Sequence, residues 1–214
     1  MFARVGGFAL AIGAAAILAS PAAAAAQGNG PGTWQFEAGG GFAIPLNGDM
    51  TDFVKTGADF DVLIGYQVQE RIGINAYGGL SLFAGKDETA GLTTDGQLPD
   101  QDFWRFGLGA EVSLTNPGGA LSALLGAGLG AANVTVSSYT TDGGVQGDVT
   151  VPSSSTTNFS TLAALKLLYR VNPNFALGAG AEWVLVFSAD TLDPSVQGTT
   201  LSYLPVKVFL RWMQ

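Results

Sequence analysis

The 214-residue sequence contains no histidine and no cysteine. Imidazole exchanges protons near neutral pH and thiolate is a strong nucleophile, so many enzyme classes depend on one or the other. Without them, neither a Ser-His arrangement nor a cysteine nucleophile can be assembled. No pair of carboxylates has a setting that suggests acid–base catalysis. We therefore expect a protein that is not an enzyme and that has no cofactor and no metal site.

Basic residues are scarce as well. The chain has nine Lys and Arg against 17 Asp and Glu, which gives a formal net charge of −8. An acidic chain repels the phosphates of DNA and RNA, so nucleic acid is not an expected partner. The lack of cysteine also excludes disulfides, so stability must come from packing and backbone pairing.

The apolar run at residues 6–19 is too short for a membrane-spanning helix. It follows Arg4 and leads into alanines that end at Ala26. This order is typical of a secretory signal peptide, which we expect to be residues 1–26 and to be cleaved. A retained N-terminal anchor is the alternative interpretation. Residues 27–32 then form a short Gly/Pro leader, and residues 33–214 are long enough for one domain.

Beyond the leader, apolar and polar residues alternate with a period of two, which predicts strands with two different faces. Eight segments show this pattern: residues 33–46, 58–69, 71–85, 102–114, 121–132, 158–170, 175–187 and 201–214. One face of every segment is continuously apolar, and the other consists mostly of Gly, Ala and Ser. No window after the leader shows a convincing helical period.

The connections between the segments alternate in length. Tight turns join the second segment to the third, the fourth to the fifth and the sixth to the seventh. The other connections are long and polar: residues 47–57, 86–101, 137–157 and 189–199. Short turns at one end and long loops at the other are typical of bacterial outer-membrane barrels. The third long loop has two β-rich arms around Asp142, which predicts a projecting hairpin ribbon.

A soluble ligand-binding barrel is the rival interpretation, because alternation alone does not say which face is inside. A solvated outer face would carry mixed charges, whereas the polar face here suits a narrow, crowded interior. Aromatic residues also gather near the ends of the apolar face. They form one expected girdle of Trp34, Tyr66, Tyr169, Phe175 and Trp212, and another of Phe42, Phe60, Trp104, Phe159 and Phe187. We therefore predict an all-β fold, an eight-stranded antiparallel up-and-down transmembrane β-barrel.

Two prolines lie within the predicted strands. Pro45 and Pro205 lack the N–H group that a ladder hydrogen bond needs. An unpaired backbone group is costly in lipid. We expect both prolines at the extracellular ends of their strands or at bulges.

The inward face carries nearly all the charge of the strands. It holds five acids (Glu37, Asp59, Asp61, Glu111 and Glu182) and five bases (Arg105, Lys166, Arg170, Lys207 and Arg211). The interior of an eight-stranded barrel is just wide enough for side chains. We expect a lumenal ion-pair network that plugs the barrel, with Arg211 beside Glu37 and Lys207 beside Glu182. A narrow gated pore is the alternative.

The segments GGGFAIPLNGDMTDF and GADFDVLIGYQVQERIGINAYGGLS resemble the opening of the small eight-stranded outer-membrane proteins. That family, the outer membrane protein β-barrel domain, includes the OmpA transmembrane domain and OmpX. The alternating last strand with Trp212 near its end is similar to the signal that the barrel assembly machinery reads. The resemblance implies a bacterial outer-membrane location and contact with lipid and lipopolysaccharide.

Within that family we expect a monomer with a structural or surface-interaction role. An adhesion or binding role through the third long loop is a further alternative, because exposed strand edges can bind by β-augmentation. The acids outside the strands lie mainly in the long loops, where solvation accounts for them. A cation-mediated contact with lipopolysaccharide phosphates is the alternative interpretation of these acids.

Overall fold

The computed structural model describes residues 30–87, 93, 96–116, 119–142, 148–189 and 199–214. The expected signal peptide, its cleavage site and the first residues of the leader lie outside the described residues. So does the turn of the predicted ribbon in the third long loop. In the part of the chain described, no helix is both long and apolar enough to cross a bilayer.

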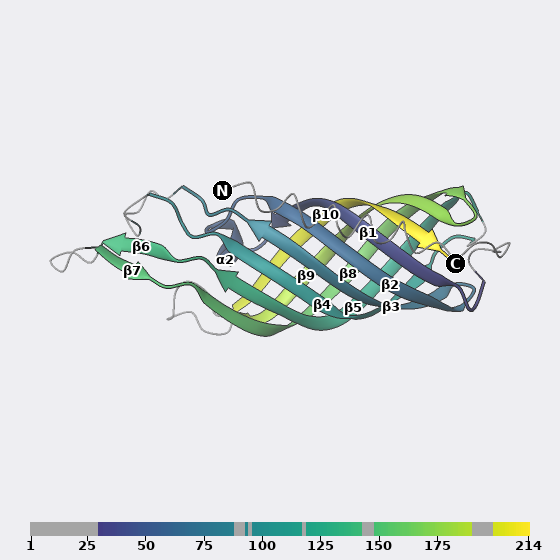
Figure 1. Cartoon of the computed structure of the whole chain (residues 1–214), viewed down its shortest axis with the longest axis horizontal. Helices are drawn as coiled ribbons and strands as arrows, with labels where there is room; N and C mark the ends of the chain where they lie inside the picture. Colours follow the sequence, from purple (N-terminus) through teal and green to yellow (C-terminus); the bar gives the residue numbers. More distant parts are fainter. Residues whose placement is uncertain (1–29, 88–92, 94–95, 117–118, 143–147, 190–198) are drawn as a thin grey trace.

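Eight antiparallel strands close into one barrel in the order β1-β10-β9-β8-β5-β4-β3-β2 (Figure 1). They are β1 (Trp34–Pro45), β2 (Gly57–Gln69), β3 (Ile72–Phe83), β4 (Gln101–Ser113), β5 (Leu121–Val136), β8 (Ser154–Asn172), β9 (Phe175–Ala189) and β10 (Thr199–Met213). The predicted fold class is therefore confirmed.

Closure depends on the pairing of the first and last barrel strands. The β1–β10 ladder runs without a shift from Gln35 opposite Met213 to Pro45 opposite Tyr203. This pairing supplies partners for the backbone groups that a sheet edge would leave open, and such groups are costly in lipid. The barrel therefore has no free edge.

The alternating apolar and polar residues of each strand lie on opposite faces of the barrel wall. Large apolar side chains on the outward positions are exposed, with Leu108 at 71%, Phe42 at 67% and Val208 at 64%. Charged residues such as Asp59 and Lys207 point inward and are buried. An apolar belt of this extent belongs against lipid, because soluble monomers rarely expose large contiguous apolar patches.

The third long loop contains the predicted ribbon, which is confirmed. Strands β5 and β8 are longer than the sequence pattern suggested and stay paired up to Val136 opposite Ser154. Beyond them β6 (Tyr139–Asp142) pairs antiparallel with β7 (Asp148–Val151). The β6–β7 ribbon projects past the end of the barrel that lies away from the C-terminus (Figure 1).

The first long loop folds inward, which the sequence pattern did not indicate. It contains the one-turn helix α2 (Gly48–Thr51), and the side chains of Met50 and Val54 are completely buried. Backbone hydrogen bonds join Lys55 N to Ala84 O at 2.8 Å and Lys86 N to Phe53 O at 2.9 Å. The first long loop therefore forms a lid over the barrel end and is joined to the residues that directly follow β3.

The two prolines differ in position. Pro45 is the last residue of β1, as expected. The expectation for Pro205 is wrong, because this residue lies inside β10 opposite Ala43 of β1 and its side chain is fully buried. The β10–β9 register is the same before and after it, and the register shift of that pair lies between Thr199 and Leu201. Pro205 is thus accommodated without a bulge.

Close approach of neighbouring strands explains one lumenal glycine. A Cβ atom built on Gly130 would lie 2.1 Å from the carbonyl oxygen of Phe106 on β4. We predict that Gly130→Ala lowers the free energy of unfolding by about 1–3 kcal/mol, since the backbone itself must shift. The control is Gly78→Ala, whose nearest atom would be 3.7 Å away. Urea unfolding in detergent micelles measures both, and equal effects would contradict the steric explanation.

Candidate functional site

The interior of the barrel holds a buried apolar cluster of Leu124, Leu168, Ala176, Phe209 and Met213, together with three further groups of side chains. Two are clusters of ion pairs, and the third is an aromatic plug under the lid. The loop-side cluster consists of Asp59, Asp61, Arg105, Glu182 and Lys207. The turn-side cluster consists of Glu37, Glu111, Lys166 and Arg211.

The loop-side cluster joins four strands. Arg105 of β4 bridges Asp59 Oδ1 of β2 at 2.8 Å and Glu182 Oε2 of β9 at 3.3 Å. Lys207 of β10 bridges Glu182 Oε1 at 2.7 Å and also contacts Asp61 of β2. All these side chains are at least nine-tenths buried. The cluster therefore has three carboxylates and two bases.

The turn-side cluster is balanced. Lys166 Nζ lies 2.6 Å from Glu37 Oε1 and 2.9 Å from Glu111 Oε1. Arg211 Nη2 lies 2.8 Å from Glu111 Oε2, and Arg211 Nε donates to Glu37 Oε2 at 2.8 Å. Arg211 Nη1 also donates to Gln35 Oε1 at 3.1 Å. Two bases and two carboxylates thus satisfy one another in a site where an unpaired charge would be costly.

The structure brings together nine of the ten charged residues singled out in the sequence. Both expected contacts, Arg211 with Glu37 and Lys207 with Glu182, are present. Arg170 is placed differently: it is half-buried near the short turns and lines a small cavity together with Arg211. The pattern of alternation could not show that the nine residues divide into two clusters.

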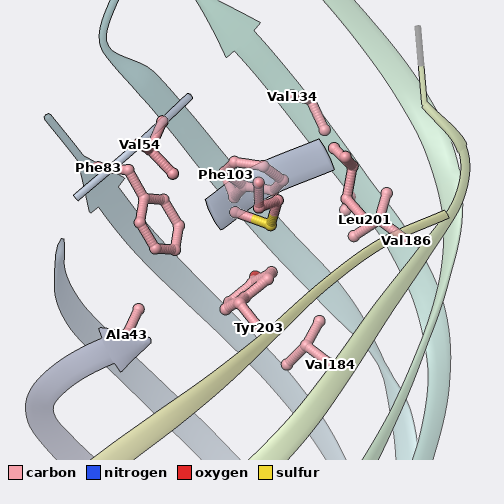
Figure 2. Close-up of a cluster of buried hydrophobic side chains, with 11 residues drawn as sticks. Ala43, Val54, Phe83, Phe103, Val134, Val184, Val186, Leu201 and Tyr203 are labelled. Atoms are coloured by element: carbon pink, nitrogen blue, oxygen red, sulfur yellow. The ribbon is translucent and has the colours of Figure 1, made fainter. Parts of the chain in front are cut away.

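The aromatic plug lies between the loop-side cluster and the lid. Phe83, Phe103 and Tyr203 contact one another with ring centroids 5.3–5.4 Å apart. Val54 of the first loop lies beside Phe83 (Figure 2), and Met50 of the same loop belongs to the same buried cluster. The cluster is completed by wall residues, which are Ala43, Ala132, Val134, Val184, Val186 and Leu201.

Sequence reasoning missed this plug. One feature of the sequence could have indicated it. At the strand ends next to the long loops, the inward positions change from small or polar residues to large apolar ones, as at Phe103, Val184 and Tyr203. The plug also contacts the charges beneath it. Arg105 lies 5.6 Å from the centre of the Tyr203 ring, and the Ser81 hydroxyl donates to Asp59 Oδ1 at 2.6 Å. Plug and loop-side cluster therefore form one continuous filling.

Asn47 fastens the lid to the last strand. Its side-chain nitrogen donates to the carbonyl of Thr200, and its Oδ1 accepts from the Ser202 amide at 3.2 Å. Leu46 N also donates to Ser202 O at 2.9 Å. These bonds hold α2 over the lumen, so that Met50 points into the plug.

The aromatic residues expected at the rims lie on the outer surface or at its edge. Trp34 and Tyr66 contact edge to face at 5.1 Å, and Trp212 lies 5.2 Å from Phe36. Trp104, Tyr169 and Phe175 are 51%, 58% and 45% exposed. Their role as interfacial girdles is a proposal based on this placement, since such rings favour the headgroup region.

The buried side chains of the lumen pack together or form ion pairs. Within the described residues, no group of three or more His, Cys, Asp or Glu side chains is arranged to hold a metal ion. The buried carboxylates of both clusters are engaged by Lys or Arg. This arrangement suits a filled, rigid interior.

We predict that Arg211→Ala lowers the free energy of unfolding by about 3–5 kcal/mol, because Glu37 and Glu111 would then share Lys166 alone. Lys55→Ala is the matched control. Lys55 pairs with Asp87 at 3.0 Å, but their side chains are 44% and 83% exposed, so at most about 1 kcal/mol is expected. Urea titration in micelles compares them, and equal losses would rule out a special contribution of the turn-side cluster.

Several solved structures of other proteins have a similar fold. Neisserial surface protein A is 15% identical with a TM-score of 0.57, over 85% of this chain and 98% of its own. A major outer membrane protein from Thermus thermophilus is 12% identical with a TM-score of 0.57, over 85% and 99%. OprG from Pseudomonas aeruginosa is 11% identical with a TM-score of 0.54, over 88% and 98%. At these identities the likeness shows the fold.

No curated protein matches the chain. The family model described as the outer membrane protein beta-barrel domain matches residues 12–203, which is most of the sequence. Together with the closed barrel of eight antiparallel strands, this match shows that the chain belongs to the outer membrane protein β-barrel domain family and is a bacterial outer-membrane protein.

Proposed function

We propose that this protein is a closed, non-catalytic outer-membrane barrel with a structural or surface-interaction role. The observation that carries the proposal is the filling of the lumen by the aromatic plug and the two ion-pair clusters. Barrels of this family lie among outer-membrane lipid and lipopolysaccharide. A barrel that cannot pass solutes acts through its wall and its extracellular loops.

The packing supports a closed state. Met50, Val54, Phe103 and Tyr203 have no exposed surface, which supports a plug that is closed to solvent on the loop side. Beneath it, the two clusters place charged side chains from six strands across the lumen. Conduction would require the packed apolar side chains to move apart and the buried ion pairs to separate. Separating buried ion pairs carries a large desolvation penalty.

Conductance in planar lipid bilayers tests the closed state. We expect the purified protein to insert and remain silent, because ions have no hydrated route through the plug. A barrel with known conductance, inserted under the same conditions, is the control for the membrane. Reproducible single-channel steps from this protein would instead support a narrow gated pore.

A second candidate function is binding through the β6–β7 ribbon. The specific observation is that the ribbon projects past the barrel, where Val149 is 45% exposed (Figure 1). A projecting two-stranded ribbon offers edges to which an extended segment of a partner can add.

Replacing residues 137–153 by Asn-Gly tests this role, because Val136 and Ser154 already face each other and a two-residue turn can join them. We expect the shortened barrel to fold with unchanged heat-dependent gel migration and to lose adhesion of expressing cells to host-cell or matrix surfaces. Gly78→Ala provides a full-length control. Adhesion that survives the replacement would contradict a binding role for the ribbon.

Membership of the outer-membrane family also suggests how the protein is exported and inserted. We propose that residues 1–26 are removed during export and that the barrel assembly machinery inserts the chain as a monomer. The support is the order of charge, apolar run and alanines at the start of the sequence, and the alternating last strand.

A further inference from the structure

A cavity of about 40 Å³ lies at the turn end of the barrel. Its wall includes Glu70 and Arg71, which are exposed in the β2–β3 turn, so the cavity opens toward the short turns. The short turns of outer-membrane barrels lie on the periplasmic side of the membrane. The cavity therefore faces the periplasm, at the opposite end from the aromatic plug and the lid.

The wall of this cavity is apolar on one side and polar on the other. Four strands that adjoin in the barrel contribute apolar side chains that are each at most 9% exposed, namely Leu124 of β5, Leu168 of β8, Ala176 of β9 and Met213 of β10. On β1 and β2, Gln35 and Gln67 contribute amide groups that hydrogen-bond to each other at 2.7 Å. Such a space suits a molecule that has both an apolar and a polar part.

The charges that line the cavity have a positive sum. They come from three arginines and two glutamates, in a chain whose formal net charge is −8. Arg211 and Glu111 belong to the balanced turn-side cluster. The other lining charges are those of Arg71, Arg170 and Glu70, which sum to one positive charge. The mouth of the cavity therefore attracts anions.

The two arginines outside the clusters are placed on different turns of the barrel. The Arg71 guanidinium donates to Asn116 Oδ1 of the β4–β5 turn at 3.3 Å, which uses one of its five N–H donors. The backbone of Arg170 is fixed near the β8–β9 turn, where its N–H donates to the carbonyl of Ala120 at 2.8 Å. A planar, forked guanidinium matches the two oxygens of a carboxylate better than a lysine ammonium does.

We propose that this cavity binds a carboxylate that carries a small apolar group. Arg71 and Arg170 pair with the carboxylate at the mouth, and the apolar group packs against Leu124, Leu168 and Ala176. The volume admits about three water-sized groups, since each needs roughly 10–15 Å³. Acetate, propionate or the C-terminal alanine of a peptide has the right size, and the rest of a peptide extends into the periplasm.

Other ligands fit the wall less well. Phosphate would place charged oxygens against Leu124 and Leu168, where they lose hydration without gaining a partner. A metal cation would meet the positive charge of the arginines. The cavity lies on the periplasmic side of the turn-side cluster, so the proposal goes beyond the closed lumen and does not depend on it.

Carbon-detected nuclear magnetic resonance of arginine-labelled protein in lipid nanodiscs tests the site, with sodium propionate as the probe. We expect the guanidinium resonances of Arg71 and Arg170 to shift to saturation, while that of Arg105 in the loop-side cluster stays in place. Formate, acetate and propionate should bind progressively tighter, by about fourfold for each added carbon, because each carbon leaves water for the apolar wall. Propionamide, the neutral isostere, should cause no shift.

Replacement of one arginine tests the carboxylate partner directly. Arg170→Gln should weaken propionate binding by about tenfold or more, since it removes a charge-assisted hydrogen bond. Lys55→Gln, which removes a base at the loop end, is the matched control and should bind as the wild type does. Heat-dependent gel migration shows whether each variant folds, and the wild-type ligand series decides alone if Arg170→Gln does not.

The proposal is overturned if propionate causes no shift, if formate binds as tightly as propionate, or if propionamide or inorganic phosphate matches propionate. N-acetyl-alanyl-alanine and its C-terminal amide distinguish two sources of the same chemistry. Tighter binding of the acid than of propionate identifies a peptide C-terminus, and binding of propionate alone identifies a free short-chain acid. A conducting barrel that still binds propionate would contradict the closed lumen alone, and a silent barrel that does not bind it would contradict the carboxylate site alone.

Discussion

The backbone pairing between β1 and β10 is the interaction on which the rest of the structure depends. In hydrocarbon a sheet cannot leave an edge open, so the chain must bring its first and last barrel strands together. Closure with eight strands produces an interior only wide enough for side chains. Every inward side chain must therefore pack, form a hydrogen bond or form an ion pair within this small volume.

That constraint explains the layered interior. Near the lid, where the first loop supplies Met50 and Val54, large apolar side chains fill the space. Farther from the lid, Arg and Lys side chains from facing strands reach across to carboxylates. Small residues such as Gly130 permit close strand contact where no side chain would fit. Apolar packing closes the lumen toward the loops, and paired charges hold the wall together below.

Much of this architecture was readable from the sequence, because a period of two follows directly from strand geometry. The parity of the alternation correctly placed Leu108 outward and Arg105 inward. The contacts across the lumen depend on strand tilt and stagger, which no local pattern reports, so the division of the charges into two clusters was not predictable. The inward folding of the first loop was not predictable either, since Met50, Phe53 and Val54 are only three apolar residues in a polar segment.

Strand β10 has a consequence for assembly, because it supplies one base to each cluster, Lys207 and Arg211. Without this strand, the five carboxylates of the clusters would face only Arg105 and Lys166 among the bases of the clusters. The excess carboxylates would then repel one another. Docking of β10 therefore completes the hydrogen-bond ladder and cancels most of that repulsion in a single step. Both the ion pairs and the backbone hydrogen bonds of β10 therefore favour completion of the barrel. Partly closed intermediates, which lack both, are disfavoured.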